Sequence, residues 1–234
     1  MYPYSSKTSF YNIHPYNRAK AYNLFGTDNP DIYYNYIRPI DRYYHERYDN
    51  YSMKICKTAL INKLHMLWEQ HIVWTRLTIT SILTDSPDVE LVTNRLLQNP
   101  VDFERTLRPF YGDKIAAEFR KLFTDHLTIA AQLVKAAKAG DTTAASQAEK
   151  NWYANADEIA IFLSRINPYW SQRDWQLMLY DHLKLTKAEA VAILTKNYSE
   201  SIRLYDEIEK QALEMADIMA EGIIKQFHYK FMPC

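Results

Sequence analysis

The sequence predicts an all-α protein: an antiparallel up-and-down helical bundle with long helices, preceded by an irregular Tyr-rich N-terminal arm. Three observations indicate this fold class. Apolar residues recur every three or four positions over long stretches, which is the period of one helix face. The 234 residues include only four Gly, too few for an all-β fold with many tight turns. Most Pro residues fall where these stretches should start or stop.

The first 51 residues differ from the rest of the chain. They contain twelve of the nineteen tyrosines and few aliphatic residues, with no sustained period. Such a segment cannot offset its conformational entropy alone, yet Tyr offers a large, stiff surface that suits packing. We therefore predict a Tyr-rich arm over residues 1–51 and a helical bundle domain over residues 52–234. The arm either lies over its own bundle, docks on a neighbouring subunit or is disordered. The expected docking tyrosines are Tyr2, Tyr4, Tyr11, Tyr16, Tyr22, Tyr33, Tyr34, Tyr36, Tyr43 and Tyr44.

The first half of the bundle domain is predicted to hold two helical stretches. Ser52 can cap a helix that runs from residue 53 to about residue 84 and includes Cys56 as a buried residue. Pro87 suits the first turn of the next stretch, which extends to about residue 107 and is interrupted at Asn99 and Pro100.

The middle of the chain is predicted to form two further helices. Residues 108–113 form a turn, and Asp113 can cap a helix over residues 114–139. Gly140 suits the end of that helix, and Asp141 suits the cap of the next, which spans residues 141–166.

The last part of the chain is predicted to contain a short helix and then the longest one. The short helix covers about residues 171–184. Thr186 and Glu189 have the spacing of a capping box that opens the final helix, over about residues 187–228. Gly222 is expected to loosen this helix near its end.

Three histidines lie on the apolar stripes of three different predicted helices, namely His71, His126 and His182. Inward imidazoles from three helices could bind one divalent metal such as zinc or nickel and leave a position open for water or substrate. The alternative is that each histidine is a core residue hydrogen-bonded to a Tyr, Asn, Asp or water. No cofactor other than this possible metal is predicted, and the absence of any Glu-x-x-His argues against a di-iron site.

The first helix also carries two Trp and an Arg within one stretch. Trp68, Trp74 and Arg76 are interpreted as a polar and aromatic seam that fixes the register of the bundle. Arg76 is expected to pair with a carboxylate such as Asp206 or to stack on Trp74.

Composition excludes several classes of protein. The formal net charge is zero, so nucleic acid is not an expected partner. No apolar run is long enough for a membrane span. The N-terminus lacks the apolar stretch of a signal peptide, which favours a cytoplasmic protein or one assembled into a spore or cell-surface structure. Two cysteines are too few for a disulfide scaffold, although Cys234 could form an intermolecular disulfide.

Several segments resemble a family of proteins. The Trp-Glu-x-His-x-x-Trp-Thr-Arg pattern of residues 68–76, together with residues 108–112, 152–159 and 222–227, looks like a set of uncharacterised bacterial helical-bundle proteins. That resemblance covers roughly residues 60–228 and implies a bundle but no activity. In architecture alone, three histidines on separate helices also resemble the DinB-like metal-binding bundles. The composition of the arm is similar to that of spore-coat and other self-assembling proteins.

These observations lead to two functional expectations. The first is a non-enzymatic structural subunit of a homo-oligomeric or filamentous bacterial assembly, in which the arm of one copy docks on the bundle of another. The alternative is a metal-binding bundle, and possibly an enzyme, built on His71, His126 and His182.

Overall fold

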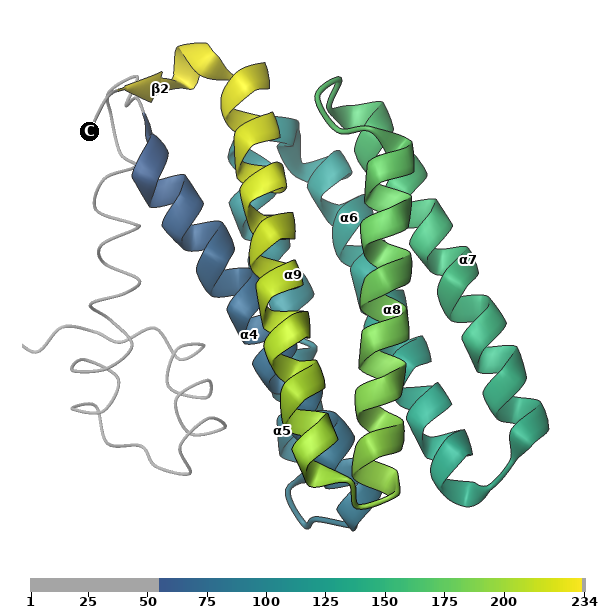
Figure 1. Cartoon of the computed structure of the whole chain (residues 1–234). Coiled ribbons are helices and arrows are strands. Elements are labelled where there is room, and N and C mark those ends of the chain that lie inside the picture. Colours follow the sequence, from purple (N-terminus) through teal and green to yellow (C-terminus); the bar gives the residue numbers. More distant parts are fainter. Residues whose placement is uncertain (1–54, 233–234) are drawn as a thin grey trace, which may run out of the picture. The chain divides into compact units, whose positions relative to one another are not determined.

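The computed structural model describes residues 55–232, and these residues fold as an all-α helical bundle (Figure 1). The predicted fold class is therefore confirmed for this part of the chain. The elements follow in the order β1 (Ile55–Cys56), α4 (Lys57–Thr84), α5 (Val89–Leu96), α6 (Asn99–Ala139), α7 (Thr142–Ile166), α8 (Gln172–Leu194), α9 (Tyr198–Gln226), the 3-10 helix η2 (His228–Lys230) and β2 (Phe231–Met232). The predicted arm over residues 1–51, with its docking tyrosines, lies outside the described residues.

The start of the first helix was predicted wrongly. Cys56 lies in the two-residue strand β1, where it faces Met232 of β2 in a parallel pair, and α4 begins at Lys57. Two residues leave no period for a pattern to detect, and the β1–β2 pairing joins positions far apart in the chain. The prediction that Cys56 is a helical residue is therefore wrong.

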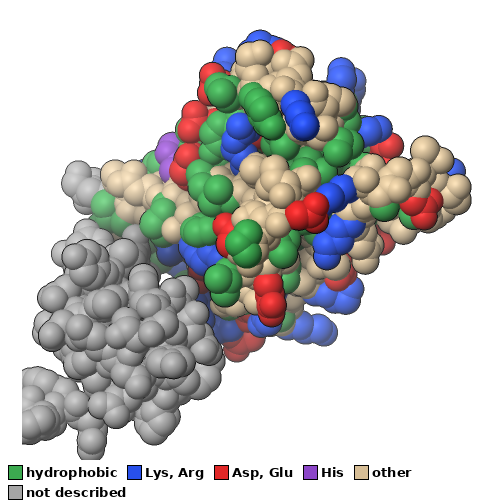
Figure 2. Space-filling view, turned by 90° about the horizontal axis from the view of Figure 1, so that it is seen from below, with side chains coloured by type: hydrophobic (Ala, Val, Ile, Leu, Met, Phe, Trp, Pro, Cys, Tyr) green, Lys and Arg blue, Asp and Glu red, His purple; other side chains and the backbone are tan. Residues whose placement is uncertain are grey.

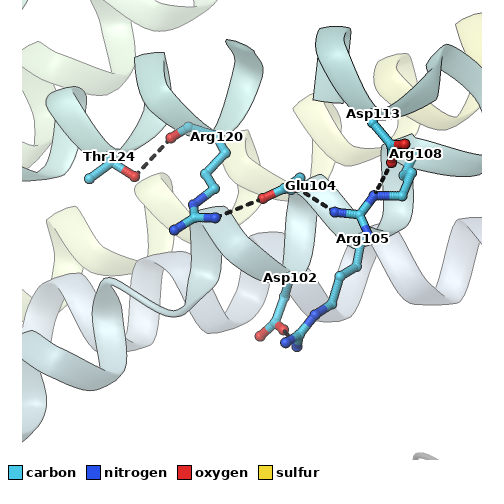
Figure 3. Close-up of polar contacts among 7 residues, drawn as sticks. All are labelled: Asp102, Glu104, Arg105, Arg108, Asp113, Arg120 and Thr124. Atoms are coloured by element: carbon cyan, nitrogen blue, oxygen red, sulfur yellow. Dashed lines mark hydrogen bonds and ion pairs between the residues drawn. The ribbon is translucent and has the colours of Figure 1, made fainter. Parts of the chain in front are cut away.

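Helix α6 contains a reversal that the sequence analysis placed correctly. Gly112 has a φ of 78° and a ψ of 171°, so the chain leaves helical geometry there and turns back. The buried carboxylate of Glu104 binds Arg108 on its own side at 2.5 Å and Arg120 beyond the turn at 3.1 Å, while Arg108 also pairs with Asp113 at 2.8 Å (Figure 3). Burial raises the pKa of Glu104, but the bonds from the two Arg side chains outweigh it and lower the pKa. The reversal is thus held by charge pairs as well as by glycine.

The boundary between the last two long helices lies elsewhere than predicted. Helix α8 continues through Thr186 and Glu189, both buried, and ends at Leu194. The actual break has Lys196 at a φ of 60° and Asn197 as the cap, accepting a hydrogen bond from the backbone of Glu200. The capping-box interpretation fails because both residues lie inside the continuous helix α8 with their side chains buried. Because α6 is broken at Gly112, α9 with its 29 residues is the longest unbroken helix of the described residues, as predicted.

Gly222 was expected to loosen the last helix, but it serves packing instead. The indole of Trp170 lies so close to this glycine that a Cβ built there would stand 1.9 Å from Trp170 Nε1. That nitrogen donates a hydrogen bond to the backbone oxygen of Ile218 at 3.1 Å. The absence of a side chain at Gly222 therefore allows the loop before α8 to pack closely against α9.

Within residues 55–232, no helix combines the length and the hydropathy that crossing a bilayer requires.

Candidate functional site

The three histidines singled out by the sequence meet in the interior of the bundle. His71 of α4, His126 of α6 and His182 of α8 are 2%, 2% and 3% exposed. The ring centroids of His71 and His182 lie 5.7 Å apart, and both His182 and His126 are close enough to His71 to help lower its pKa. We call this group the imidazole cluster.

The three segments that carry the cluster, namely α4, the part of α6 after Gly112, and α8, run in the same direction. Phe123 of α6 packs on Trp68 of α4, and Lys138, fifteen residues further on, donates to the backbone oxygen of Ile82 at 2.6 Å. Similarly, Glu189 of α8 pairs with Arg76 of α4, beyond the contact between the two histidines. In parallel helices, residues at matching positions lie at one level of the bundle. The three imidazoles therefore form a single layer.

The tautomer of His126 follows from its hydrogen bonds. Asn155 of α7 donates its amide Nδ2 to the backbone oxygen of Leu122 at 3.1 Å, so its Oδ1 must be the atom that faces His126. Because Oδ1 can only accept, His126 donates from Nδ1 across 2.8 Å. The neutral ring then carries its lone pair on Nε2, which is the form that can accept a proton, a hydrogen bond or a metal ion.

All three imidazoles are held neutral by their surroundings. Burial lowers the pKa of His126 and of His182 to about 4. The hydrogen bond that His126 donates to Asn155 opposes the shift of the first, and the nearby Gln211 side chain opposes that of the second. Burial lowers the pKa of His71 well below its usual range, and the two neighbouring imidazoles add to this. The Nδ1 atoms of His71 and His182 are buried without a hydrogen-bond partner. The cluster is therefore uncharged near neutral pH. The Nδ1 atoms of His71 and His182 could still form hydrogen bonds.

The imidazole cluster packs against aromatic rings. His71 lies 5.8 Å from Trp68 and 5.0 Å from Phe123, and His126 lies 5.4 Å from Trp152, between ring centroids. Over the part of the chain that the structure describes, no three His, Cys, Asp or Glu side chains are placed so that they could hold a metal ion. As folded, the cluster is a polar layer inside an aromatic core.

The seam residues of α4 have partners other than those expected. Trp68 is buried against the cluster. Trp74 is half-buried, and the cation above its ring is Arg95 at 5.1 Å, so Arg76 does not stack there. Arg76 instead pairs with the buried Glu189 and lies 5.0 Å from the ring centre of Tyr205. The prediction that Arg76 pairs with Asp206 or stacks on Trp74 is therefore wrong. The sequence analysis had assigned Glu189 to a helix cap, so it did not consider this residue as a partner for Arg76.

An apolar pocket lies on one side of the imidazole cluster. Its lining begins one turn after His126, at Ala130, and one turn after His182, at Thr186, and it continues toward the ends of α4, α6 and α8 and the start of α7. The pocket has a volume of about 280 Å³. The buried apolar side chains of the described bundle form one large cluster and a smaller one, and the lining includes Trp152 from the first and Ile79 from the second. The pocket thus lies at the boundary between the large and the small group of buried apolar side chains.

Two polar atoms of the lining residues have no partner. Trp152 and Thr186 are 3% and 4% exposed, and both Trp152 Nε1 and Thr186 Oγ1 are buried without a hydrogen bond. The sequence analysis missed both residues, since it interpreted Thr186 as a cap. Asn155 was missed as well, although an Asn on the apolar face of residues 152–163 is the kind of signal that could have indicated a buried hydrogen bond.

Comparison with known proteins identifies no relative from which a role could be carried over. No protein-family model, no curated protein and no solved structure matches this chain.

Proposed function

We propose that this protein binds a small apolar molecule in the pocket beside the imidazole cluster. The observation that carries the proposal is an apolar pocket of about 280 Å³ whose lining residues hold two buried, unpartnered polar atoms. Small-molecule sites in proteins are typically concave and apolar, with a few polar groups that orient the ligand, and the spaces between helices of a bundle are a common place for them. This arrangement is of that kind.

The size of the pocket limits the size of the ligand. A cavity of roughly 150 Å³ is known to hold benzene. The larger volume here suits a single ring with a short chain attached. The pocket therefore favours a compact molecule over a long acyl chain.

Filling the pocket with protein should abolish binding. Ala130 of α6 is half-buried and lines the pocket, whereas Ala117 of the same helix is exposed and does not. We expect butyrophenone to bind the wild type and Ala117→Phe equally in calorimetric titration. Ala130→Phe should bind at least about tenfold more weakly, which corresponds to roughly 1.4 kcal/mol. Ala190→Leu, on the other wall, is a milder second variant should Ala130→Phe fold poorly.

The proposal is wrong if a pocket-filling variant has the stability of the wild type and also binds butyrophenone with the affinity of the wild type. Absence of binding to any form of the full chain would have the same meaning.

A divalent metal at the imidazole cluster is the second candidate function. The specific observation in its favour is that three neutral imidazoles from three helices lie together, one of them in the tautomer with a free Nε2. Holding a metal requires the rings to turn from their present positions, since no metal-holding group exists among residues 55–232 as folded. Metal analysis of protein purified without an affinity tag tests this role: a stoichiometric metal lost on His126→Ala would support it, and metal-free protein would remove it.

A further inference from the structure

The unpartnered atoms of the pocket define a chemical class for its ligand, on the premise that the pocket is the binding site proposed above. An indole N–H can only donate a hydrogen bond, so Trp152 Nε1 needs an acceptor. A buried donor that finds no partner costs about 1–3 kcal/mol. Nε1 itself has almost no accessible surface as folded, so an acceptor on a ligand in the pocket would remove this penalty after a small rotation of the indole toward it.

The hydroxyl of Thr186, like those of Thr75 and Thr78 in α4, is buried without a hydrogen-bond partner, whereas other helical threonines bond to their own backbone. Thr195 of the same helix and Thr128 of α6 donate to the backbone oxygen four residues earlier, at 2.9 Å each. This back-bonding is the usual way for a helical hydroxyl to be satisfied. Thr186 is buried and makes no such bond, so its hydroxyl proton is available to another acceptor. Two donors from two helices, α7 and α8, are thus unused among the lining residues of one pocket.

The charges around the pocket disfavour an anionic ligand. The one cationic side chain of the described lining is Lys187, and it binds both carboxylate oxygens of Glu149, at 2.6 Å and 2.7 Å. Both members of this pair are partly exposed, which places their charges toward the solvent side of the pocket. The imidazoles beyond Trp152 are buried and neutral. A carboxylate inside would therefore lose its hydration without gaining a free counter-charge.

We infer that the ligand is an uncharged, mainly apolar molecule that carries one oxygen acceptor, of the ketone, aldehyde or ester type, which accepts hydrogen bonds from Trp152 and Thr186. The apolar walls hold the hydrocarbon part, and the two donors fix the position of the oxygen.

Three probes with similar hydrocarbon parts test this inference on the full-length protein. Butyrophenone is the ketone, pentylbenzene is a hydrocarbon with the same number of non-hydrogen atoms, and 4-phenylbutanoate is the matching anion. Transfer from water alone would favour pentylbenzene, because the carbonyl must lose its hydration. We expect butyrophenone to bind about tenfold more tightly than either of the others in calorimetric titration.

Matched variants show whether the two donors cause the preference. Thr186→Val keeps the branched shape and removes the hydroxyl, and Trp152→Phe keeps an aromatic ring and removes the N–H. Each should reduce the preference for butyrophenone over pentylbenzene by about three- to tenfold while leaving the affinity for pentylbenzene unchanged. Thr195→Val, whose hydroxyl is satisfied by its own helix, should leave both affinities unchanged.

The outcomes separate the inference from the function on which it rests. If none of the three probes binds, the binding function itself is wrong. If pentylbenzene binds as tightly as butyrophenone, the pocket is a binding site and the oxygen-acceptor class is wrong. Tightest binding of 4-phenylbutanoate would overturn the class in favour of an anion. A preference for butyrophenone that survives Thr186→Val and Trp152→Phe would overturn the assignment of the two donors.

Discussion

Gly222 shows how one missing side chain can determine the contact between two segments. Alanine in a helix is normally more stable than glycine by up to about 1 kcal/mol. At this position the Cβ would stand 1.9 Å from Trp170 Nε1, so the indole would have to move and its bond to Ile218 would break. We therefore expect Gly222→Ala to lower the free energy of unfolding by about 1–3 kcal/mol, the usual range for overpacking. Urea unfolding followed by circular dichroism measures this change.

A neighbouring substitution provides the control for this prediction. Glu221 lies beside Gly222 on the same helix, but its side chain is 67% exposed. Glu221→Ala should change the free energy of unfolding by less than about 0.5 kcal/mol. A Gly222→Ala variant as stable as Glu221→Ala would show that the indole can leave at no cost.

The pair of Arg76 and Glu189 places a charge in the interior. The Glu189 side chain is 2% exposed and Arg76 is 26% exposed, and Arg76 also donates to the backbone oxygen of Ser201. Burial raises the pKa of Glu189, and the Arg76 guanidinium opposes this shift. Removing Arg76 leaves a buried carboxylate without a partner, so Arg76→Met should cost about 3 kcal/mol in urea unfolding.

The double variant separates lost pairing from lost packing. Replacing both members of a buried pair with apolar residues is often neutral, so Arg76→Met with Glu189→Met should recover most of that stability. Equal losses in the single and double variants would mean that Arg76 matters through its contacts with Ser201 and Tyr205 and not through the charge.

At the scale of elements, the sequence predicts helices best where local signals act alone. Gly140, with a φ of 71°, and the cap Asp141 lie where predicted, because glycine and a capping carboxylate act through the nearest backbone. Thr186 and Glu189 carry an equally good local signal but are needed by the pocket and by Arg76. Tertiary contacts therefore outweighed the capping pattern at these two residues. The break between α8 and α9 lies instead at Lys196 and Asn197, where the sequence pattern for a helix boundary is weaker.

The layer of histidines across α4, α6 and α8 should make the stability of the bundle depend on pH. The folded pKa of His126 and His182 is about 4, below the ordinary value of 6.5. Between these two values the unfolded chain binds protons that the folded bundle cannot bind, so the free energy of unfolding falls as the pH falls from 6.5 toward 4. Each of these histidines should contribute up to about 3 kcal/mol to the loss. Urea unfolding at several pH values across this window measures it.

Two variants show whether buried histidines cause the loss. His182→Gln should make the decline between pH 6.5 and 4 less steep, because one of the groups that binds protons only in the unfolded chain is gone. His228 is exposed in η2, and His228→Gln should leave the decline as in the wild type. A decline that His182→Gln does not change would assign the pH dependence to carboxylates.

At the scale of the molecule, apolar patterns in the sequence can indicate which residues are buried. They cannot predict the cavities that remain between the packed side chains. His71, His126 and His182 lie on apolar stripes, so their burial could be predicted from spacing. Their common level in the bundle depends on the reversal at Gly112, which makes the second part of α6 parallel to α4. The pocket could not be predicted at all, because it results from how Trp152, Ile79 and their neighbours pack in three dimensions.

The exposed apolar residues of the bundle bear on the predicted assembly. Val191 and Leu194 near the end of α8 are 47% and 38% exposed, and Tyr198 and Ile202 at the start of α9 are 55% and 57% exposed. Figure 2 looks onto this end of the bundle, where hydrophobic side chains lie among charged ones. Val191 and Leu194 are one turn apart, as are Tyr198 and Ile202, and exposed apolar side chains that adjoin on a surface are the kind that contact a partner.

Removing the Tyr-rich arm tests whether the chain assembles through it. We predict that a variant without residues 1–50 folds but is monomeric, because the described bundle has its own core and the arm carries the tyrosines that would dock on another copy. Light scattering should show large particles for the full chain and monomers for the truncated one. In the full chain, Ile202→Asp should weaken assembly, because it places a charge among the exposed apolar residues around the turn from α8 to α9. The exposed Glu221→Ala should not change it. A truncated protein that assembles as the full chain does would show that the arm is not the contact.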